Sequence, residues 1–194
     1  DLATAKMMNG DLVAAEASYK EALAIDIAYL GEDHPEVASA RENLGNVYFR
    51  SGRYDETLRS LDAVLAARRK ALGSDSEAVA RTQANMATVY KKAGKLQDAD
   101  RLYREALPVL TVKSGTESLD VASVNANLGD NLRQEGRLDE AEPFMRRALE
   151  IRAKVLGETH PATQRTLKML ADLATARGKP EEAAAYTARI VPAK

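Results

Sequence analysis

Glycine recurs along this chain at a fixed spacing, and that regularity constrains the fold more than any other feature. All 11 glycines of the 194 residues lie on three phases of a 42-residue period. Self-similarity at such a period is typical of repeat architectures, in which each supersecondary unit stacks on the next. We therefore expect a single repeat array over residues 1–194, with partial repeats at both ends and repeat boundaries near Gly10, Gly52, Gly94, Gly136 and Gly178.

Between the glycines, apolar residues follow the spacing of amphipathic helices. After residue 52, for example, Leu58, Leu61 and Leu65 recur at intervals of three or four residues, which is the period of one helix face. A second helix is expected to follow residue 73, after candidate capping residues, and to stop at residue 94. Each unit is therefore predicted to be a helical hairpin, and the chain to be all-α, an α-α superhelix of about five hairpins.

Two local features qualify this pattern. Small residues share one phase at which paired helices must approach closely, and Gly45 and Gly129 are two of them. Pro108 lies inside a predicted helix, where its ring clashes with the carbonyl four residues earlier. We therefore expect a kink or an early helix end near Leu107.

Composition excludes several classes of function. The net charge of -1 gives no general attraction to nucleic acid or anionic lipid, and the few aromatic residues lie mostly at core phases. The absence of cysteine excludes disulfides and thiolate chemistry. No apolar run approaches the roughly 18 to 20 residues that span a bilayer, and no signal peptide pattern opens the chain. We expect no membrane insertion, a cytoplasmic location and, because residue 1 is not Met, a processed chain or part of a larger protein.

The two histidines, His34 and His160, are three whole periods apart and occupy the same loop phase, each directly before a proline. They cannot share one active site in a rigid array, so each is expected to stabilise its turn. No phosphate-binding loop, nucleophile elbow or His-x-x-x-His pair is present. The sequence therefore predicts no catalytic residue, no metal site and no cofactor.

The pattern Leu44-Gly45-x-x-Tyr48, followed by Gly52-Arg-Tyr54, resembles the tetratricopeptide repeat. The period exceeds the usual length of about 34 residues, and segments 30–35 and 156–161 read Leu-Gly-x-x-His-Pro. This combination is similar to the repeat of kinesin light chains, which also occurs in many bacterial signalling and regulatory proteins. The resemblance covers the whole chain. It implies a protein-interaction module whose concave surface is lined by the first helix of each hairpin, roughly residues 36–50, 78–92, 120–134 and 162–176.

Three asparagines recur at one phase of these first helices, at Asn43, Asn85 and Asn127, while the fourth unit has Met169. Asparagine costs about 0.5 kcal/mol relative to alanine inside a helix, so three in register need a reason. A carboxamide can both donate to and accept from the backbone of an extended peptide, and in the resembled family asparagine at these positions contacts bound peptides. The alternative is that these asparagines hydrogen-bond between neighbouring hairpins as part of the architecture.

Polar and basic residues around the asparagines complete the predicted peptide-binding face. Its residues are Asn43, Asn46, Arg50, Arg81, Asn85, Thr88, Lys91, Lys92, Asn127, Asp130, Arg133 and Lys168. The four first helices together carry a small positive excess, so we expect an extended peptide with acidic residues beside an apolar or aromatic anchor. The equal alternative is that these cations are ordinary solvated groups at helix ends, where they suit the helix dipole.

The leading prediction is a non-catalytic, monomeric scaffold for a protein or peptide partner, with no nucleic acid bound. Self-assembly is a rival, because the chain opens with half a hairpin at residues 1–9 and ends soon after Tyr186 and Ile190 without a polar capping helix. Exposed terminal faces then let copies stack end to end as a homo-oligomer. A regulatory or adaptor role applies if the chain is part of a larger signalling protein or enzyme.

Overall fold

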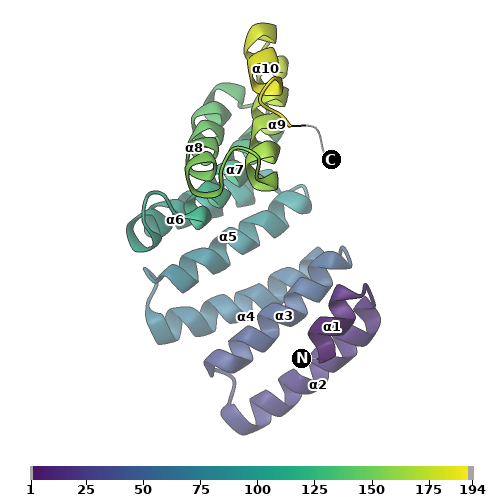
Figure 1. Ribbon diagram of the computed structural model, residues 1–194. Coiled ribbons are helices and arrows are strands. Elements are labelled where there is room, and N and C mark those ends of the chain that lie inside the picture. Colours follow the sequence, from purple (N-terminus) through teal and green to yellow (C-terminus); the bar gives the residue numbers. More distant parts are fainter. Residues whose placement is uncertain (1, 192–194) are drawn as a thin grey trace. The chain divides into compact units, whose positions relative to one another are not determined.

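The structure is a computed structural model that describes residues 2–191, in which all regular structure is α-helical (Figure 1). The prediction of an all-α chain is confirmed. Residues 1 and 192–194, the ends of the predicted array, lie outside the described residues. No helix within residues 2–191 has the length and apolar character to cross a bilayer. The helices are α1 Leu2–Met8, α2 Leu12–Leu30, α3 Pro35–Arg50, α4 Tyr54–Leu72, α5 Glu77–Lys92, α6 Leu96–Ser114, α7 Leu119–Gln134, α8 Leu138–Leu156, α9 Pro161–Ala176 and α10 Pro180–Thr187.

The chain divides into two compact units, Asp1–Gly94 and Lys95–Lys194, here called unit 1 and unit 2. In unit 1, α1 packs on α2 and α3 on α4, while α2 contacts α3 and α4 contacts α5. In unit 2, α7 packs on α8 and α9 on α10, while α6 contacts α7 and α8 contacts α9. Each unit is thus a stack of helical hairpins. That the whole chain forms a single array stays a prediction.

Glycines end the second helices of the hairpins, and the next helices begin a few residues later, as predicted. Gly31 ends α2 with φ 84° and ψ 160°, and Gly157 ends α8 with φ 88° and ψ 162°, a backbone region that is essentially restricted to glycine. The next helices start at the expected histidines. The Nδ1 atoms of His34 and His160 accept hydrogen bonds from backbone N–H groups two residues later, at 3.3 and 3.1 Å. Both histidines therefore stabilise turns, as the sequence predicts.

An early helix end near Leu107, one of the two alternatives predicted, does not occur. Helix α6 continues through Pro108 and ends at Ser114, and the alternative of a kink stays a prediction. Pro108 is exposed, whereas Ala106 and Leu110 on either side are buried. Because the proline ring faces solvent and its neighbours pack into the core, the loss of one backbone hydrogen bond does not terminate the helix.

Two glycines inside helices allow close packing within a hairpin. A Cβ atom added at Gly129 on α7 would lie 2.6 Å from Met145 Cγ and 3.1 Å from the carbonyl oxygen of Ala141 on α8. A Cβ atom added at Gly45 on α3 would lie 3.3 Å from Ser60 Cβ on α4. Both positions are close-packing points, as predicted, and the approach is tighter in unit 2.

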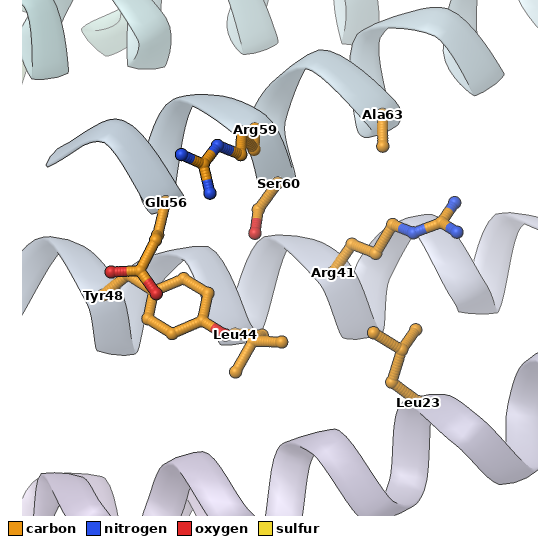
Figure 2. A pocket seen from close by; sticks show the side chains of 8 residues that line it. All are labelled: Leu23, Arg41, Leu44, Tyr48, Glu56, Arg59, Ser60 and Ala63. Carbon is orange, nitrogen blue, oxygen red and sulfur yellow. The ribbon is translucent and has the colours of Figure 1, made fainter. Parts of the chain in front are cut away.

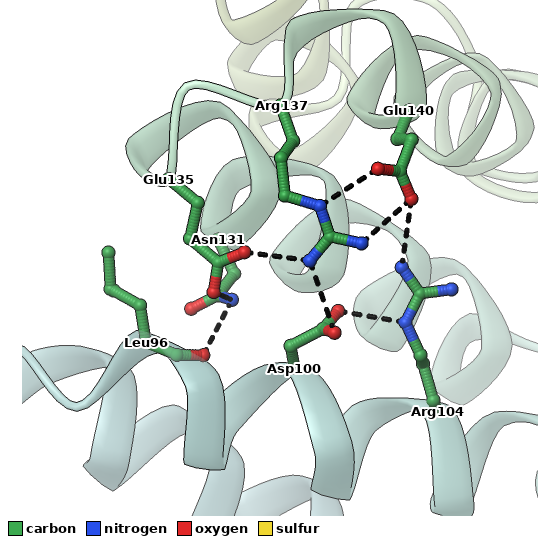
Figure 3. Close-up of polar contacts among 7 residues, drawn as sticks. All are labelled: Leu96, Asp100, Arg104, Asn131, Glu135, Arg137 and Glu140. Atoms are coloured by element: carbon green, nitrogen blue, oxygen red, sulfur yellow. Dashed lines mark hydrogen bonds and ion pairs between the residues drawn. The ribbon is translucent and has the colours of Figure 1, made fainter.

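An ion-pair network centred on Arg137 joins α6, α7 and α8 in unit 2 (Figure 3). Arg137 donates to Glu140 and Glu135 at 2.8 Å each and to Asp100 at 3.3 Å. Asp100 also accepts from Arg104 at 2.9 Å. The Arg137 guanidinium holds the pKa of Glu140 below its usual value.

The same network occurs in unit 1, two periods earlier in the sequence. Arg53 donates to Glu56 at 2.6 Å and to Glu16 at 2.5 Å, and Lys20 pairs with Glu16 at 2.7 Å. These contacts lower the pKa values of Glu16 and Glu56. Repetition therefore extends from the backbone to the ion pairs between helices.

Candidate functional site

A groove opens between α3 and α5 in unit 1, and residues of α4 complete its lining. Its cavity is about 150 Å³. Glu42, Asn46 and Phe49 of α3 and Asn85 and Thr88 of α5 line this opening, which we call the unit 1 groove. Both asparagines are exposed and the threonine is half-buried. Three residues of the predicted peptide-binding face therefore meet at one opening.

Glu42 is the central polar group of the unit 1 groove. Its carboxylate accepts hydrogen bonds from Arg68 of α4 at 2.6 Å and from Nδ2 of Asn85 at 3.3 Å. Arg68 also donates to Thr82 Oγ1 of α5 at 2.7 Å. Asn85 therefore makes the contact between neighbouring hairpins that the architectural interpretation expects. Within residues 2–191, its carboxamide oxygen accepts no hydrogen bond and is free to bind a ligand.

The other predicted residues of α3 lie beside this groove. Asn43 is exposed and follows Glu42 directly in the sequence. Arg50 is also exposed, and its Nη1 donates to the carbonyl oxygen of Met7 at 2.8 Å. Arg50 therefore joins α3 to the start of unit 1.

The predicted cations of α5 lie along and at the end of that helix. Arg81 is exposed and pairs with Glu77 one turn earlier at 2.5 Å. Lys91 is half-buried and Lys92 is exposed in the last turn. Cations in a last turn suit the helix dipole, so their position alone does not distinguish binding from capping.

In unit 2 the predicted residues lie on α7 and α9. Asn127 is half-buried on α7, and Lys168 is exposed on α9. Asp130 and Arg133 of α7 pair with each other at 2.9 Å. The structure thus brings together the predicted acidic residue and one of the predicted basic ones.

Two arginines on the second helices of hairpins were missed by the sequence analysis. Arg68 of α4 donates to Glu42, which lines the unit 1 groove, and Arg152 of α8 donates to Thr166 Oγ1 of α9 at 2.7 Å. These arginines share one phase of the period, and so do Thr82 and Thr166. The recurrence of an arginine and a threonine at the same two phases could have indicated this contact from the sequence.

A second cavity, of about 290 Å³, lies among α2, α3 and α4 in unit 1 (Figure 2). Leu23, Leu44 and Tyr48 provide its apolar lining, and the small side chain of Ser60 also lines it. At the phase of Ser60, unit 2 has Phe144, whose ring lies 5.7 Å from a guanidinium of α6. A bulky side chain in one unit thus corresponds to a space in the other. None of the predicted binding residues lines this cavity.

Within the part of the chain that the structure describes, no group of three or more His, Asp or Glu side chains is placed to hold a metal ion. Asn127, Asp130 and Arg133 of α7 and Lys168 of α9 form a second candidate surface, which we call the α7/α9 face. The unit 1 groove and the α7/α9 face offer hydrogen-bond donors, acceptors and positive charge on rigid helices. These are the elements of molecular recognition.

The tetratricopeptide repeat model matches residues 1–56, 36–111 and 120–192. The chain therefore belongs to the tetratricopeptide repeat family, whose members are generally non-catalytic scaffolds for protein interactions. No curated protein matches the sequence.

Solved structures share the fold. BtubC (BKLC) from P. vanneervenii is 28% identical over 97% of this chain and 75% of its own, with a TM-score of 0.85. A putative kinesin light chain from P. anserina, with nearly identical tetratricopeptide-like repeats, is 24% identical over 97% of this chain and 90% of its own, with a TM-score of 0.81. The Rap conjugation gene regulator of plasmid pLS20, solved with the Phr* peptide, is 18% identical over 96% of this chain and 50% of its own, with a TM-score of 0.74. The resemblance to kinesin light chain repeats is confirmed.

Proposed function

We propose that this protein is a non-catalytic scaffold that holds an extended peptide segment of a partner protein in the unit 1 groove. One observation carries the proposal: Asn46, Asn85 and Thr88 meet at the opening between α3 and α5. Their amide and hydroxyl groups match the alternating N–H and C=O groups of an extended backbone. The Rap regulator that shares this fold, and whose structure contains a peptide, supports this function.

The groove also suits one apolar side chain of the peptide. Phe49 is half-buried and lines the cavity beside the polar groups. Burial of an anchor there contributes about 25 cal/mol per Å² of apolar area. The basic last turn of α5, with Lys91 and Lys92, favours acidic residues next to that anchor.

The test begins with selection of binders from a random peptide library on the full chain. The variant Asn46→Ala/Asn85→Ala/Thr88→Ala, which changes the three groove residues, is then compared with wild type for the selected peptides by isothermal titration calorimetry. We expect roughly tenfold weaker binding, because each lost carboxamide or hydroxyl leaves peptide backbone groups unpaired. Asn9→Ala, an exposed asparagine between α1 and α2, is the matched control. Unchanged affinity in the triple variant, with helicity preserved, contradicts the role of the three groove residues.

Self-assembly is the second candidate, and two exposed apolar side chains of α2 favour it. Ile25 and Tyr29 lie one helical turn apart and are 52% and 86% exposed, and exposed apolar surface often marks an interface. Light scattering over a concentration series tests it, and a strict monomer contradicts it. A cytoplasmic location, a regulatory role in a larger protein and the absence of nucleic-acid binding stay predictions.

A further inference from the structure

Arg68 of unit 1 and Arg152 of unit 2 lie two periods apart and make the same first contact. Nη1 of Arg68 donates to Thr82 Oγ1, and Nη1 of Arg152 donates to Thr166 Oγ1, both at 2.7 Å. Each guanidinium therefore reaches from the second helix of a hairpin to the next first helix, α5 in unit 1 and α9 in unit 2.

The second contact of the two arginines differs. Nη2 of Arg68 donates to the Glu42 carboxylate at 2.6 Å. The residue of α7 at the phase of Glu42 is Ala126, and Nη2 of Arg152 reaches only Ser123 Oγ, at 3.5 Å. No carboxylate pairs with Arg152 within residues 2–191. The guanidinium in unit 2 thus lacks the counter-ion that its counterpart has.

Arg165 of α9 adds positive charge near Arg152. Arg165 and Lys168 of α9 are exposed, and neither forms an ion pair within the described residues. Burial, and then the nearby charge of Arg165, lower the pKa of the Arg152 guanidinium. Arginine nevertheless stays protonated in proteins. Arg152 donates to neutral groups, namely the hydroxyls of Thr166 and Ser123 and the carbonyl oxygen of Ala162. A half-buried cation without a counter-ion carries a desolvation cost that an anion would relieve.

The polar partner of Glu42 is also replaced in unit 2. Asn85, which donates to Glu42 in unit 1, corresponds in phase to Met169 of α9, and Met169 is half-buried. The site around Arg152 is therefore basic on one side and apolar on another. Such a combination matches an acidic residue with an apolar neighbour on the same peptide.

We propose that the α7/α9 face around Arg152 binds the carboxylate of an acidic side chain in a bound peptide. The carboxylate accepts from Nη2 of Arg152, as Glu42 does from Arg68 in unit 1, while Arg165 and Lys168 add long-range attraction. The chain's own use of Glu42 as the partner of an equivalent arginine favours a carboxylate over other anions. This inference rests on the proposed peptide-binding function and assigns the place of one acidic residue.

The test uses two pools of short peptides with random flanks and a fixed central residue, Glu in one pool and Gln in the other. Each pool is passed over the immobilised full chain, and the retained amounts are compared. Wild type is expected to retain the Glu pool about tenfold more strongly, because one charge-assisted hydrogen bond distinguishes the pools.

Ala126→Glu supplies from within the chain the carboxylate that Arg152 lacks, and Arg152→Gln removes the receptor. Both variants are expected to lower the ratio of the two pools several-fold, to the preference that Lys91 and Lys92 in the last turn of α5 supply. Ala66→Glu, at an exposed position of α4, is the charge-matched control and is expected to leave the ratio unchanged. Ala126 is 4% exposed, so thermal unfolding checks above all that Ala126→Glu folds, and either variant that folds decides the question.

The outcomes separate this inference from the proposed function. Retention of neither pool by wild type overturns peptide binding itself. If wild type retains peptides but the folded variants show the same preference for the Glu pool as wild type, the site at Arg152 is overturned and the proposed function is not. A phosphoserine-centred pool that outcompetes the Glu pool, and loses that advantage in the same variants, overturns the assignment of the ligand as a carboxylate.

Discussion

Units 1 and 2 contain equivalent helices two periods apart, yet they treat equivalent positions differently. In unit 1, Glu42 neutralises Arg68, whereas Arg152 in unit 2 has Ala126 at that phase. Ser60 borders a cavity in unit 1, where unit 2 has an aromatic ring. The hairpin scaffold depends on periodic apolar residues and glycines, so single differences between equivalent positions change the polar contacts and the packing of each unit while the hairpins are kept.

The largest expected difference between the units is at their close-packing glycines. Gly129→Ala should lower the free energy of unfolding by about 2 kcal/mol, because its Cβ would clash with Met145 and the Ala141 carbonyl. Gly45→Ala should be nearly neutral, because its looser contact with Ser60 is offset by a gain of about 1 kcal/mol in helix propensity. Urea unfolding followed by circular dichroism measures both. Equal effects of the two variants would show that α3 and α4 pack as closely at Gly45 as α7 and α8 do at Gly129.

Exchanging the residues at the phase of Ser60 should alter stability in opposite directions. Phe144→Ser is expected to cost about 2 kcal/mol, because it removes a half-buried ring from unit 2. Ser60→Phe is expected to stabilise unit 1 by about 1 kcal/mol, because its ring enters the cavity among α2, α3 and α4. Thermal unfolding checks both variants. A destabilising Ser60→Phe would mean that the cavity cannot accept an aromatic ring.

The smallest expected effect concerns the ion networks at low pH. Contacts with Arg53 and Arg137 lower the folded-state pKa values of Glu56 and Glu140 from 4.5. A lowered folded-state pKa stabilises the fold above the unfolded-state pKa, and this contribution is lost as the pH falls through the folded-state pKa. Wild type should therefore lose more stability between about pH 7 and pH 3 than Arg53→Gln or Arg137→Gln.

The reduction should be larger for Arg53→Gln, since hydrogen bonds from Lys20 and Arg53 lower the pKa of Glu16 and those from Arg53 lower the pKa of Glu56, whereas Arg137 lowers the pKa of Glu140. Urea midpoints at each pH measure the effect, and high salt should shrink it because these groups are half-buried or exposed and solvent ions reach them. Identical pH profiles for wild type and both variants would contradict it.

Features set by local periodicity were predictable from the sequence. The hairpins, the capping role of His34 and His160, and the close approach at Gly129 depend on neighbours a few residues away or on one repeated phase. The continuation of α6 through Pro108 was not predictable, because it depends on which face of the helix the core leaves exposed.

The candidate site was only partly predictable for a similar reason. Asn46 and Thr88 share one phase and Asn85 lies on the phase three residues earlier, so the spacing indicates one helix face, and the structure brings these three residues to one groove. Arg50 illustrates the limit, since its bond to the Met7 carbonyl joins groups far apart in the sequence. The reach of Arg68 and Arg152 from the second helices likewise depends on long side chains that cross between elements, and helical periodicity alone does not report such contacts.

The backbone of Gly31 and Gly157 has a consequence for how such a chain can change length. Residues with side chains are essentially excluded from that conformation, so each of these helix ends is tied to one position in the sequence. A one-residue insertion inside the preceding helix would rotate its apolar face by about 100° and displace the glycine from the turn. Duplication or loss of a whole 42-residue repeat preserves both the orientation of the apolar face and the position of the glycine in the turn. We therefore expect this protein to change in length by whole repeats and not by single residues within these helices.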